Sequence, residues 1–448
     1  MPIRIAHPSQ IIKGEIHLTA SKSESNRALI IEALCNDSLV IENLSISDDT
    51  KVLNELLNNS SQDKNEGSEN PNKQKSGAVS DNNQRVLSVN LAGTAIRFLT
   101  AYLAIQDEKV VLTGAQRMKE RPIKVLVDVL NQMGADISYK ENEGFPPLNI
   151  CGKKLFGEKI TIDGGISSQY ISALLMIAPK LAQGLTIAFE GEIISKPYIN
   201  MTIEMMRYFG AAVQWEGDAL VVASGNYKAR DFKVEADWSA ASYWYSMVAL
   251  AKEADVTLYG LKQESLQGDA VVQSIYKNFG VTTEFVEGGI RLRKKSAFST
   301  QDLELTIDFI NCPDIAQTVA VSCAALNVKA KLTGLKTLRI KETDRISAIQ
   351  TELTKLGFSV DVDGDDILIN KKSSFVNLQK NLEQAHSQND GVVSLAMPSV
   401  ETYDDHRMAM AFAPLALQKS IIIEDQDVVG KSYPNFWKDI ASVGFEVV

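Results

Sequence analysis

The sequence predicts an α/β protein with two domains, each built from three copies of one repeated strand–loop–helix–strand unit. The chain has 448 residues, which is too long for one ordinary hydrophobic core. Its composition, 45% hydrophobic and 23% charged, is typical of a soluble globular protein. Along the chain, a short apolar strand ending at a glycine is repeatedly followed by a polar loop, an amphipathic helix and another strand.

Six copies of this unit can be recognised, and most of their helices are expected to stop at a C-cap glycine. The four clear copies begin at Leu112, Phe189, Leu258 and Leu332, and their glycines are Gly134, Gly210, Gly280 and Gly357. Two weaker copies begin at Ile41 and Ile421, and the second of these reaches Gly444. Six units favour two domains of three; chance similarity among generic segments is the alternative.

The helix starts carry an unusual charge pattern. We expect them thirteen residues before the glycines, at Arg121, Pro197, Gln267, Asp344 and Lys431. Cations lie at or beside four of these five positions. A helix N-terminus favours acids, so cations there are a local conflict of the kind that marks a functional site. The pattern predicts helix starts that bind anions.

One segment departs from the repeat. Between residues 58 and 84, only Ala78 and Val79 are apolar. Such a segment cannot bury enough surface to offset the entropy lost on ordering. We therefore expect a mobile polar insertion at about 58–84.

Charge and composition exclude several classes of protein. The net charge of -10 argues against a nucleic-acid or acidic-membrane surface, although it leaves room for a locally basic pocket. The four cysteines lack CxxC spacing and the four histidines form no ligand motif, so we expect reduced thiols and no metal site. No signal peptide and no apolar run of membrane-spanning length is found, so we expect a cytoplasmic protein.

The segment Ser21–Leu34 predicts a helix that begins near Ser23 or Ser25. Lys22, Ser23 and Arg27 at that start offer a hydroxyl and two cations to an anionic ligand. A plain serine N-cap is the alternative.

The segment at residues 91–105 has a small-residue turn before another helix. Gly93 allows a ligand to approach the backbone, and Arg97 lies in the first helical turn. The turn is neither a Walker motif nor a dinucleotide fingerprint, so neither ATP nor NAD is indicated.

Further helix starts carry polar or charged residues, and for the first two of them N-capping is the alternative explanation. Residues 164–179 have two hydroxyls and an amide at the start, which favours a polar ligand wall, and residues 311–326 place an acid after a proline. A helix from residue 404 begins with acids, a histidine and an arginine. The residues in question are Ser167, Ser168, Gln169, Asp314, His406 and Arg407.

The segment LRIKETDRI, residues 338–346, crowds five charges into nine residues. A solvated helix start is the ordinary explanation for such a run. The cations at the other helix starts favour a functional one. The five charged residues are Arg339, Lys341, Glu342, Asp344 and Arg345.

Eight motifs occur in the order found in 5-enolpyruvylshikimate-3-phosphate synthases, and the chain resembles that family from about Lys13 to Phe445. The motifs are SKSESNRAL, AGTAIR, RMKERPI, SSQYISALL, SKPYI, KETDRI, DHRMAMAF and GKSYPNFW. The resemblance implies a two-domain inside-out α/β barrel, the enolpyruvyl transferase fold, with three βαβαββ units in each domain. It also implies a discontinuous domain of residues 1–20 plus 238–448 and an inserted domain of residues 21–237.

The implied reaction moves the carboxyvinyl group of phosphoenolpyruvate to the 5-hydroxyl of shikimate 3-phosphate and releases phosphate, in the pathway to chorismate and aromatic amino acids. This addition–elimination at carbon requires no metal or redox cofactor. The expected partners are these two small molecules, with no nucleic acid and no membrane, and we expect a monomer.

The resemblance assigns residues to each substrate. The shikimate 3-phosphate contacts are Lys22, Ser23, Arg27, Ser167, Ser168, Gln169, Ser195, Tyr198, Asp314 and Lys341. The phosphoenolpyruvate contacts are Lys22, Gly93, Arg121, Gln169, Arg345, Arg407 and Lys431, with Arg97 and His406 as secondary residues. Asp314 would be the general base, and Glu342, with Lys22 as its rival, would protonate the methylene carbon. Domain closure would expel water.

Two positions depart from the family pattern, and two other functions compete. Leu91 and Thr337 stand where the family usually has asparagine; we expect the Gly93 backbone and the Thr337 hydroxyl to cover part of those roles. A UDP-N-acetylglucosamine 1-carboxyvinyltransferase typically has a cysteine in the loop at residues 114–117, which here has none. A non-catalytic anion-binding protein of the same fold would have lost its acids and Lys22, which are present. Gly93 should also admit the phosphoenolpyruvate mimic glyphosate.

Overall fold

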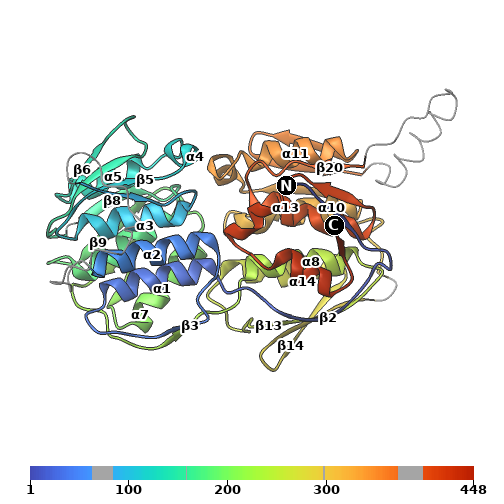
Figure 1. The fold of residues 1–448 in the computed structure, drawn as a ribbon, viewed down its shortest axis with the longest axis horizontal. Helices are drawn as coiled ribbons and strands as arrows, with labels where there is room; N and C mark the ends of the chain where they lie inside the picture. Colours follow the sequence, from blue (N-terminus) through green and yellow to red (C-terminus); the bar gives the residue numbers. More distant parts are fainter. Residues whose placement is uncertain (63–83, 158, 296–297, 372–396) are drawn as a thin grey trace, which may run out of the picture. The chain divides into compact units, whose positions relative to one another are not determined.

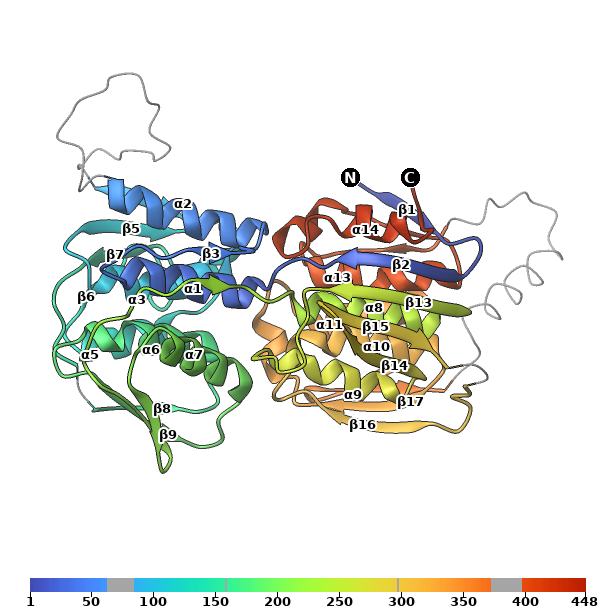
Figure 2. The ribbon, with the colours of Figure 1, turned by 90° about the horizontal axis from the view of Figure 1, so that it is seen from below.

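The computed structural model describes residues 1–62, 84–157, 159–295, 298–371 and 397–448. It divides into two compact units, one made of Met1–Thr19 with Glu235–Val448 (unit 1) and the other of Ala20–Val234 (unit 2). Figures 1 and 2 show the chain from two directions. Most of the polar insertion expected at about 58–84 lies outside the described residues; residues 58–62 belong to α2 (Asp48–Gln62).

Four-stranded sheets of one topology repeat through both units. In each, the first two strands are parallel and two antiparallel strands extend the sheet. In unit 2 the sheets contain β4 (Arg85–Ser88), β5 (Lys109–Thr113), β6 (Asp136–Tyr139) and β7 (Leu148–Cys151), and β8 (Lys159–Asp163), β9 (Leu185–Glu190), β10 (Val213–Glu216) and β11 (Ala219–Val222). The predicted repeat is therefore confirmed.

Unit 1 has three sheets of this kind. Two of them contain β2 (Ile11–His17), β13 (Glu253–Tyr259), β14 (Val281–Val286) and β15 (Gly289–Lys294), and β16 (Glu304–Asp308), β17 (Lys329–Thr333), β18 (Ser359–Asp363) and β19 (Asp366–Asn370). The third contains β20 (Ser399–Val400), β21 (Ile421–Ile423), β1 (Ile3–Ala6) and β22 (Glu446–Val447). The N-terminal strand β1 lies between β21 and the C-terminal strand β22, so both chain ends meet in this sheet. Figure 2 shows the N- and C-termini close together beside β1.

The weak copy that begins at Ile41 is reduced in the structure. Its strand β3 (Ile41–Glu42) forms only a two-stranded parallel pair with β12 (Phe232–Lys233) in the described chain. The copy that begins at Ile421 is complete, because β1 closes its sheet.

Helices lie inside each unit and the sheets lie outside, which is the predicted inside-out arrangement. The central helices of unit 1 are α8 (Trp238–Leu250), α10 (Ala316–Ala325) and α13 (His406–Phe412), and those of unit 2 are α1 (Lys22–Leu34), α3 (Gly93–Ala104) and α6 (Ser168–Ile177). Nearly every residue of α8, α10 and α13 is buried, because these helices are apolar on all sides. Strands such as β8 instead alternate exposed and buried residues, so one sheet face meets solvent.

The remaining helices lie between the strands of each unit. They are α4 (Gln116–Lys119), α5 (Lys124–Gln132), α7 (Lys196–Tyr208), α9 (Val272–Lys277), α11 (Arg345–Lys355) and α14 (Phe436–Ser442). Short 3-10 helices are η1 (Ala178–Lys180), η2 (Gly268–Val271), η3 (Pro313–Ile315), η4 (Lys336–Ile340), η5 (Ala413–Leu417) and η6 (Asp427–Lys431). None of the described helices is long and apolar enough to span a membrane.

The predicted helix ends are right, whereas some predicted starts are wrong. All five C-cap glycines follow a helix with φ between 78° and 104°, a conformation that favours glycine. Asp344 does cap α11, accepting a bond from Ser347 N at 3.2 Å. Arg121, however, precedes α5 by three residues, and Lys431 ends η6 ahead of α14. Counting thirteen residues back from the glycine gives the wrong helix start there, because a 3-10 turn or an extra loop comes before the α-helix.

Candidate active site

The central helices of unit 1 begin next to a group of charged side chains that we call the acid–base cluster. Its members come from η3, from the loop between η4 and α11, and from the first residue of α11. The others come from the start of α13 and the end of η6. They are Asp314, Lys341, Glu342, Arg345, Asp405, Arg407 and Lys431. Four cations thus face three carboxylates.

Asp314 lies at the centre of this cluster. Its Oδ1 atom is 3.3 Å from Lys341 Nζ and 3.4 Å from Arg345 Nη1, and its Oδ2 atom accepts a bond from Arg407 Nη2 at 2.9 Å. Arg407 also donates to the Asp314 carbonyl at 3.0 Å. The side chain does not cap α10, whose N-cap residue is Ile315. The capping alternative for Asp314 is therefore wrong.

Arg345 and Asp405 form the buried base of the cluster. Arg345 donates through Nε at 2.7 Å and through Nη2 at 3.2 Å to the two oxygens of Asp405, a bidentate pair. Asp405 also caps α13 by accepting a bond from Arg407 N at 2.9 Å. One carboxylate therefore fixes both Arg345 and the helix that carries Arg407.

Glu342 is held by two cations. Its Oε1 atom is 2.7 Å from Lys431 Nζ, and its Oε2 atom accepts a bond from Arg345 Nη2 at 3.0 Å. The Glu342 side chain is only 13% exposed, so these charge contacts are partly shielded from water. Lys431, although not at an α-helix start, thus joins the predicted set.

The cluster shifts the pKa values of its members. Burial alone would raise the pKa of Asp314, but Arg407, Lys341 and Arg345 outweigh burial and hold that pKa well below its ordinary value. Burial lowers the pKa of Lys341, and Asp314 opposes the shift. Burial would also lower the pKa of Arg345, but the carboxylates of Asp405 and Glu342 outweigh burial and raise that pKa. Asp314 is consequently a carboxylate at neutral pH.

A second group, which we call the anion cluster, consists of the predicted substrate contacts of unit 2, near the starts of α1, α3, α5, α6 and α7. They are Lys22, Ser23, Arg27, Gly93, Arg121, Ser167, Ser168, Gln169, Ser195 and Tyr198. Arg27 is the most buried cation of this group. Arg27 donates to Thr202 Oγ1 at 2.7 Å and to Ser172 Oγ at 3.1 Å. It also donates to the carbonyls of Ser23 and Tyr198, at 2.9 and 3.3 Å. All of these partners are neutral, and burial lowers the pKa of Arg27 to about 10.

Lys22 begins α1 and has an acidic partner. Its Nζ atom is 3.0 Å from Asp49 Oδ2, a carboxylate that is 6% exposed. The helix begins slightly earlier than predicted, because Ser21 rather than Ser23 or Ser25 is the N-cap, accepting from Glu24 N at 3.3 Å. Ser23 is therefore not the N-cap of α1, which was the alternative to its predicted role in binding an anion.

Gly93 lies against Arg121. A Cβ atom at Gly93 would stand 2.5 Å from Arg121 Nη1, so any other residue there would force this guanidinium to shift. Arg97 donates to the Gly93 carbonyl at 2.8 Å and thereby supports the turn. Gln169 donates to Thr94 Oγ1 at 2.9 Å and joins the start of α6 to that of α3.

Ser195 has an unusual backbone conformation. It precedes α7 with φ 53° and ψ 33°, the left-handed region that non-glycine residues seldom adopt, and its side chain makes no cap bond. Strained residues of this kind concentrate at functional sites. Tyr198 follows in the first turn of α7. Ser167 is the N-cap of α6, accepting from Gln169 N at 3.4 Å, and Ser168 is buried behind it.

Sequence reasoning missed several supporting residues. Asp405 stands beside the predicted His406 and Arg407 at a helix start, so its capping position was the signal that could have found it. Asp49, Ser172 and Thr202 gave no local signal, because the chain brings them to Lys22 and Arg27 only on folding. His406 is buried, with Nδ1 3.6 Å from Asp405 Oδ1.

The two positions that depart from the motifs differ in the structure. Asn90, next to Leu91, is exposed and has φ 50°, and its carbonyl accepts from Ala115 N at 2.9 Å. The Thr337 hydroxyl oxygen is buried and has no hydrogen-bond partner among the residues that the structure describes. The expected role of the Thr337 hydroxyl stays a prediction.

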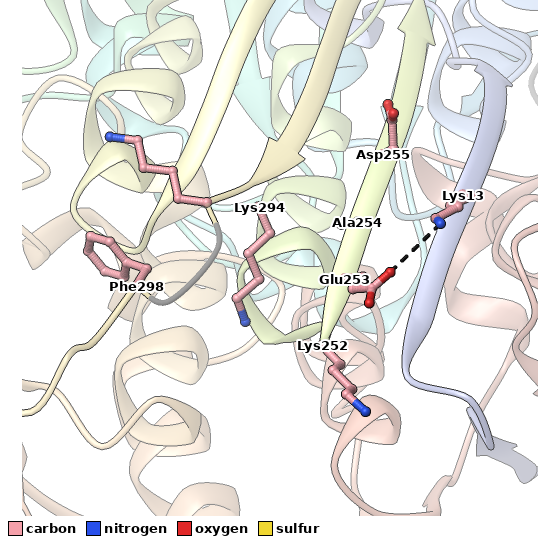
Figure 3. Close-up of a pocket in the computed structure, with 8 residues that line it drawn as sticks. Lys13, Lys252, Glu253, Ala254, Asp255, Lys294 and Phe298 are labelled. Carbon is pink, nitrogen blue, oxygen red and sulfur yellow. Dashed lines mark ion pairs between the residues drawn. The ribbon is translucent and has the colours of Figure 1, made fainter.

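A hollow on the outer sheet of unit 1 contains none of the predicted residues (Figure 3). Its acids already have cationic partners, Glu253 with Lys13 at 3.7 Å and Asp255 with Arg291 at 2.6 Å. Lys294 donates to the Ala249 carbonyl at 2.9 Å, at the end of α8. This lysine satisfies carbonyls at the C-terminal end of α8, and the hollow gives no sign of catalytic chemistry.

Comparisons with known proteins agree on one family. The model of the family described as EPSP synthase (3-phosphoshikimate 1-carboxyvinyltransferase) matches residues 6–440. A Bacteroides fragilis protein named 3-phosphoshikimate 1-carboxyvinyltransferase is 45% identical over 445 residues, which cover 99% of this chain and 98% of the relative. One of the same name from Colwellia psychrerythraea is 36% identical and covers 98% of each chain.

Solved structures show the same fold. A structure titled EPSP synthase from Acinetobacter baumannii superposes with a TM-score of 0.72 and covers 100% of this chain and 99% of its own, at 22% identity. The predicted fold class is confirmed by this match.

Proposed function

Since the chain belongs to the EPSP synthase (3-phosphoshikimate 1-carboxyvinyltransferase) family, it is an enolpyruvyl transferase of the shikimate pathway, and we propose that the two clusters supply its binding and catalytic side chains. The substrates are then phosphoenolpyruvate and shikimate 3-phosphate. The carboxyvinyl group moves to the 5-hydroxyl of the latter and phosphate leaves.

One observation carries the assignment of roles: a carboxylate, Asp314, is held by three cations at the start of a central helix. The carboxylate is ionised and can accept a proton from a hydroxyl. The cations that hold it can also bind the phosphate and carboxylate groups that both substrates carry.

Asp314 acts as the general base in this proposal. A carboxylate whose pKa is held far below its ordinary value is a weak base, so the free protein keeps Asp314 inactive. Substrate anions that bind Lys341, Arg345 and Arg407 draw part of this positive charge away from Asp314. Its basicity then rises only when substrate is bound, which ties proton removal to binding.

Glu342 acts as the proton donor to the methylene carbon, with Lys22 as the rival donor. In the structure both Glu342 oxygens face cations, Lys431 and Arg345. Phosphoenolpyruvate binds these same cations in the proposal, which frees the carboxyl group to take up a proton and deliver it. Lys22, for its part, must leave or share Asp49 to reach a substrate.

The anion cluster of unit 2 supplies most of the binding. The hydrogen-bond acceptors of the buried Arg27 are all neutral, and the Glu24 carboxylate only partly offsets the effect of burial on its pKa. An anion bound beside Arg27 would therefore improve its charge balance. We assign the binding of shikimate 3-phosphate to Arg27 and to nine further residues, of which the last two belong to unit 1. They are Lys22, Ser23, Ser167, Ser168, Gln169, Ser195, Tyr198, Asp314 and Lys341. We assign phosphoenolpyruvate to Lys22, Gly93, Arg121, Gln169, Arg345, Arg407 and Lys431.

We also propose that units 1 and 2 are the two domains expected from the sequence, and that the protein works as a cytoplasmic monomer. Four cysteines without a disulfide suit a reducing compartment. Sedimentation of the purified chain tests the oligomeric state.

A coupled assay of phosphate release tests the function. Release from phosphoenolpyruvate is expected to require shikimate 3-phosphate. Release that requires UDP-N-acetylglucosamine instead would favour the other carboxyvinyltransferase, and no release with either acceptor would favour a non-catalytic anion-binding protein.

A further inference from the structure

Arg339 is a charged residue of the LRIKETDRI segment to which no role has been given, and its guanidinium makes three separate contacts. Its Nε atom donates to Asp365 Oδ1 at 2.6 Å, and Nη1 donates to Asp344 Oδ2 at 3.0 Å. Its Nη2 atom donates to the Gly364 carbonyl. Each arm of the planar guanidinium therefore has its own acceptor, a geometry that lysine cannot reproduce.

These contacts bracket the loop that carries the candidate catalytic residues. The 3-10 helix η4 ends at Ile340 and α11 starts at Arg345, so Lys341 and Glu342 lie in the irregular loop between them. The bond from Arg339 to Asp344 joins the two ends of this loop. Asp344 is itself fixed, because it caps α11 and accepts a bond from Ser347 Oγ at 2.9 Å.

The other two contacts of Arg339 lie in a hairpin turn of the sheet. Gly364 and Asp365 form the two-residue turn between β18 and β19, in which Asp363 pairs with Asp366. Short hairpin turns of this kind are fixed by the register of their strands. Arg339 therefore fastens the loop to the sheet as well as closing it.

We propose that Arg339 is a positioning residue for enolpyruvyl transfer, which acts by fixing Glu342 in its loop; this rests on the role proposed for Glu342. The pair partners are partly exposed, at 34% for Arg339 and 40% for Asp365, so they contribute little to global stability. A small displacement of a catalytic group nevertheless lowers turnover strongly. The contacts matter for catalysis more than for folding.

The test compares Arg339→Ala with a matched control, Arg293→Ala. Arg293 is a similarly exposed arginine of the same unit, 3.0 Å from Glu284. Arg339→Ala is expected to lower kcat about 10- to 100-fold while shifting Tm by no more than a few degrees. Arg293→Ala should keep kcat within about twofold. Arg339→Lys is expected to restore only part of the loss, and an Arg339→Ala variant with normal kcat overturns the proposal.

A double-mutant cycle with Glu342→Gln separates positioning from a general structural role. If Arg339 acts through Glu342, Arg339→Ala lowers kcat much less in the Glu342→Gln background than in the wild type. Equal factors in both backgrounds overturn the proposal. If Glu342→Gln alone leaves kcat normal, the proposed role of Glu342 fails first, whereas an impaired Glu342→Gln with a normal Arg339→Ala refutes only this inference.

Discussion

Arg345 in unit 1 and Arg27 in unit 2 are both buried, at 1% and 3% exposed, but their guanidinium groups have different kinds of hydrogen-bond partner. Arg345 contacts three carboxylates, those of Asp405, Glu342 and Asp314. Arg27 contacts two hydroxyls and two backbone carbonyls. The difference is visible in their pKa values, which burial lowers for Arg27, to about 10, and which Asp405 and Glu342 raise for Arg345 despite burial.

This difference indicates separate roles for the two units, proton transfer for unit 1 and substrate affinity for unit 2. In the proposed function, substrate anions compete with the protein's own carboxylates in the acid–base cluster, so binding should release Asp314 and Glu342 for proton transfer. In the anion cluster, an anion beside Arg27 would displace no hydrogen-bonded carboxylate, so its contact with Arg27 should add to the affinity. Changes in unit 1 should therefore lower turnover, and changes at Arg27 should weaken binding.

The largest expected effect is that of Asp314→Ala. Loss of the general base should lower kcat by about 10²- to 10⁴-fold, and the freed cations should leave substrate KM values unchanged or lower. Phosphate release measures turnover, and circular dichroism checks that the variant is folded. Turnover near that of the wild type would remove Asp314 as the base.

Arg27→Gln should give the opposite pattern. Losing one charged hydrogen-bond donor should raise the KM for shikimate 3-phosphate about 10- to 100-fold and change kcat much less. Steady-state kinetics with varied shikimate 3-phosphate measures both parameters. Arg207→Gln is the matched control, since Arg207 is an exposed arginine of α7 paired with Glu204 at 2.6 Å. If the control raises KM as much, the comparison between the units is wrong.

Gly93→Ala should have a smaller, selective effect. The new Cβ would stand 2.5 Å from Arg121 Nη1, and the flexible guanidinium must shift. We expect the KM for phosphoenolpyruvate to rise several-fold and glyphosate to inhibit less, with the KM for shikimate 3-phosphate unchanged. Gly225→Ala, where a Cβ meets open space, should behave as the wild type. An inhibition curve identical to that of the wild type would argue against this packing.

The smallest expected effect concerns acid stability. The pKa of Asp314 is lower in the folded protein than its ordinary value near ~3.9, so its contribution to stability is present above that pH and is lost as the pH falls below it. Thermal unfolding between about pH 5 and pH 3 should therefore depend less on pH in Asp314→Asn than in the wild type. Parallel curves for the two proteins would show that the cations do not favour the ionised form.

Features with a local signature could be predicted from the sequence. The glycines after the helices, such as Gly210 and Gly357, mark the left-handed backbone that ends a helix, and Asp344 has the right position to cap α11. The cations near the helix starts have a local signature too, and their binding of anions stays a prediction. In each case the physical cause lies within a few residues of the signal.

Features made by distant parts of the chain could not be predicted. Asp405 meets Arg345 across 60 residues, and Thr202 meets Arg27 across 175. The contacts of Arg339 with Asp365 and Gly364 depend on a hairpin turn that lies 26 residues away in the chain. The left-handed backbone of Ser195 also gave no signal, because serine carries no preference for it. Tertiary packing decides these contacts.

The division of work between the units is tested most directly by the dissociation constant for shikimate 3-phosphate, measured by calorimetry on the wild type, Asp314→Ala and Arg27→Gln. We predict that Asp314→Ala binds within a few-fold of the wild type although it barely turns over, and that Arg27→Gln binds about tenfold more weakly or worse. Weaker binding by Asp314→Ala than by Arg27→Gln would contradict the account.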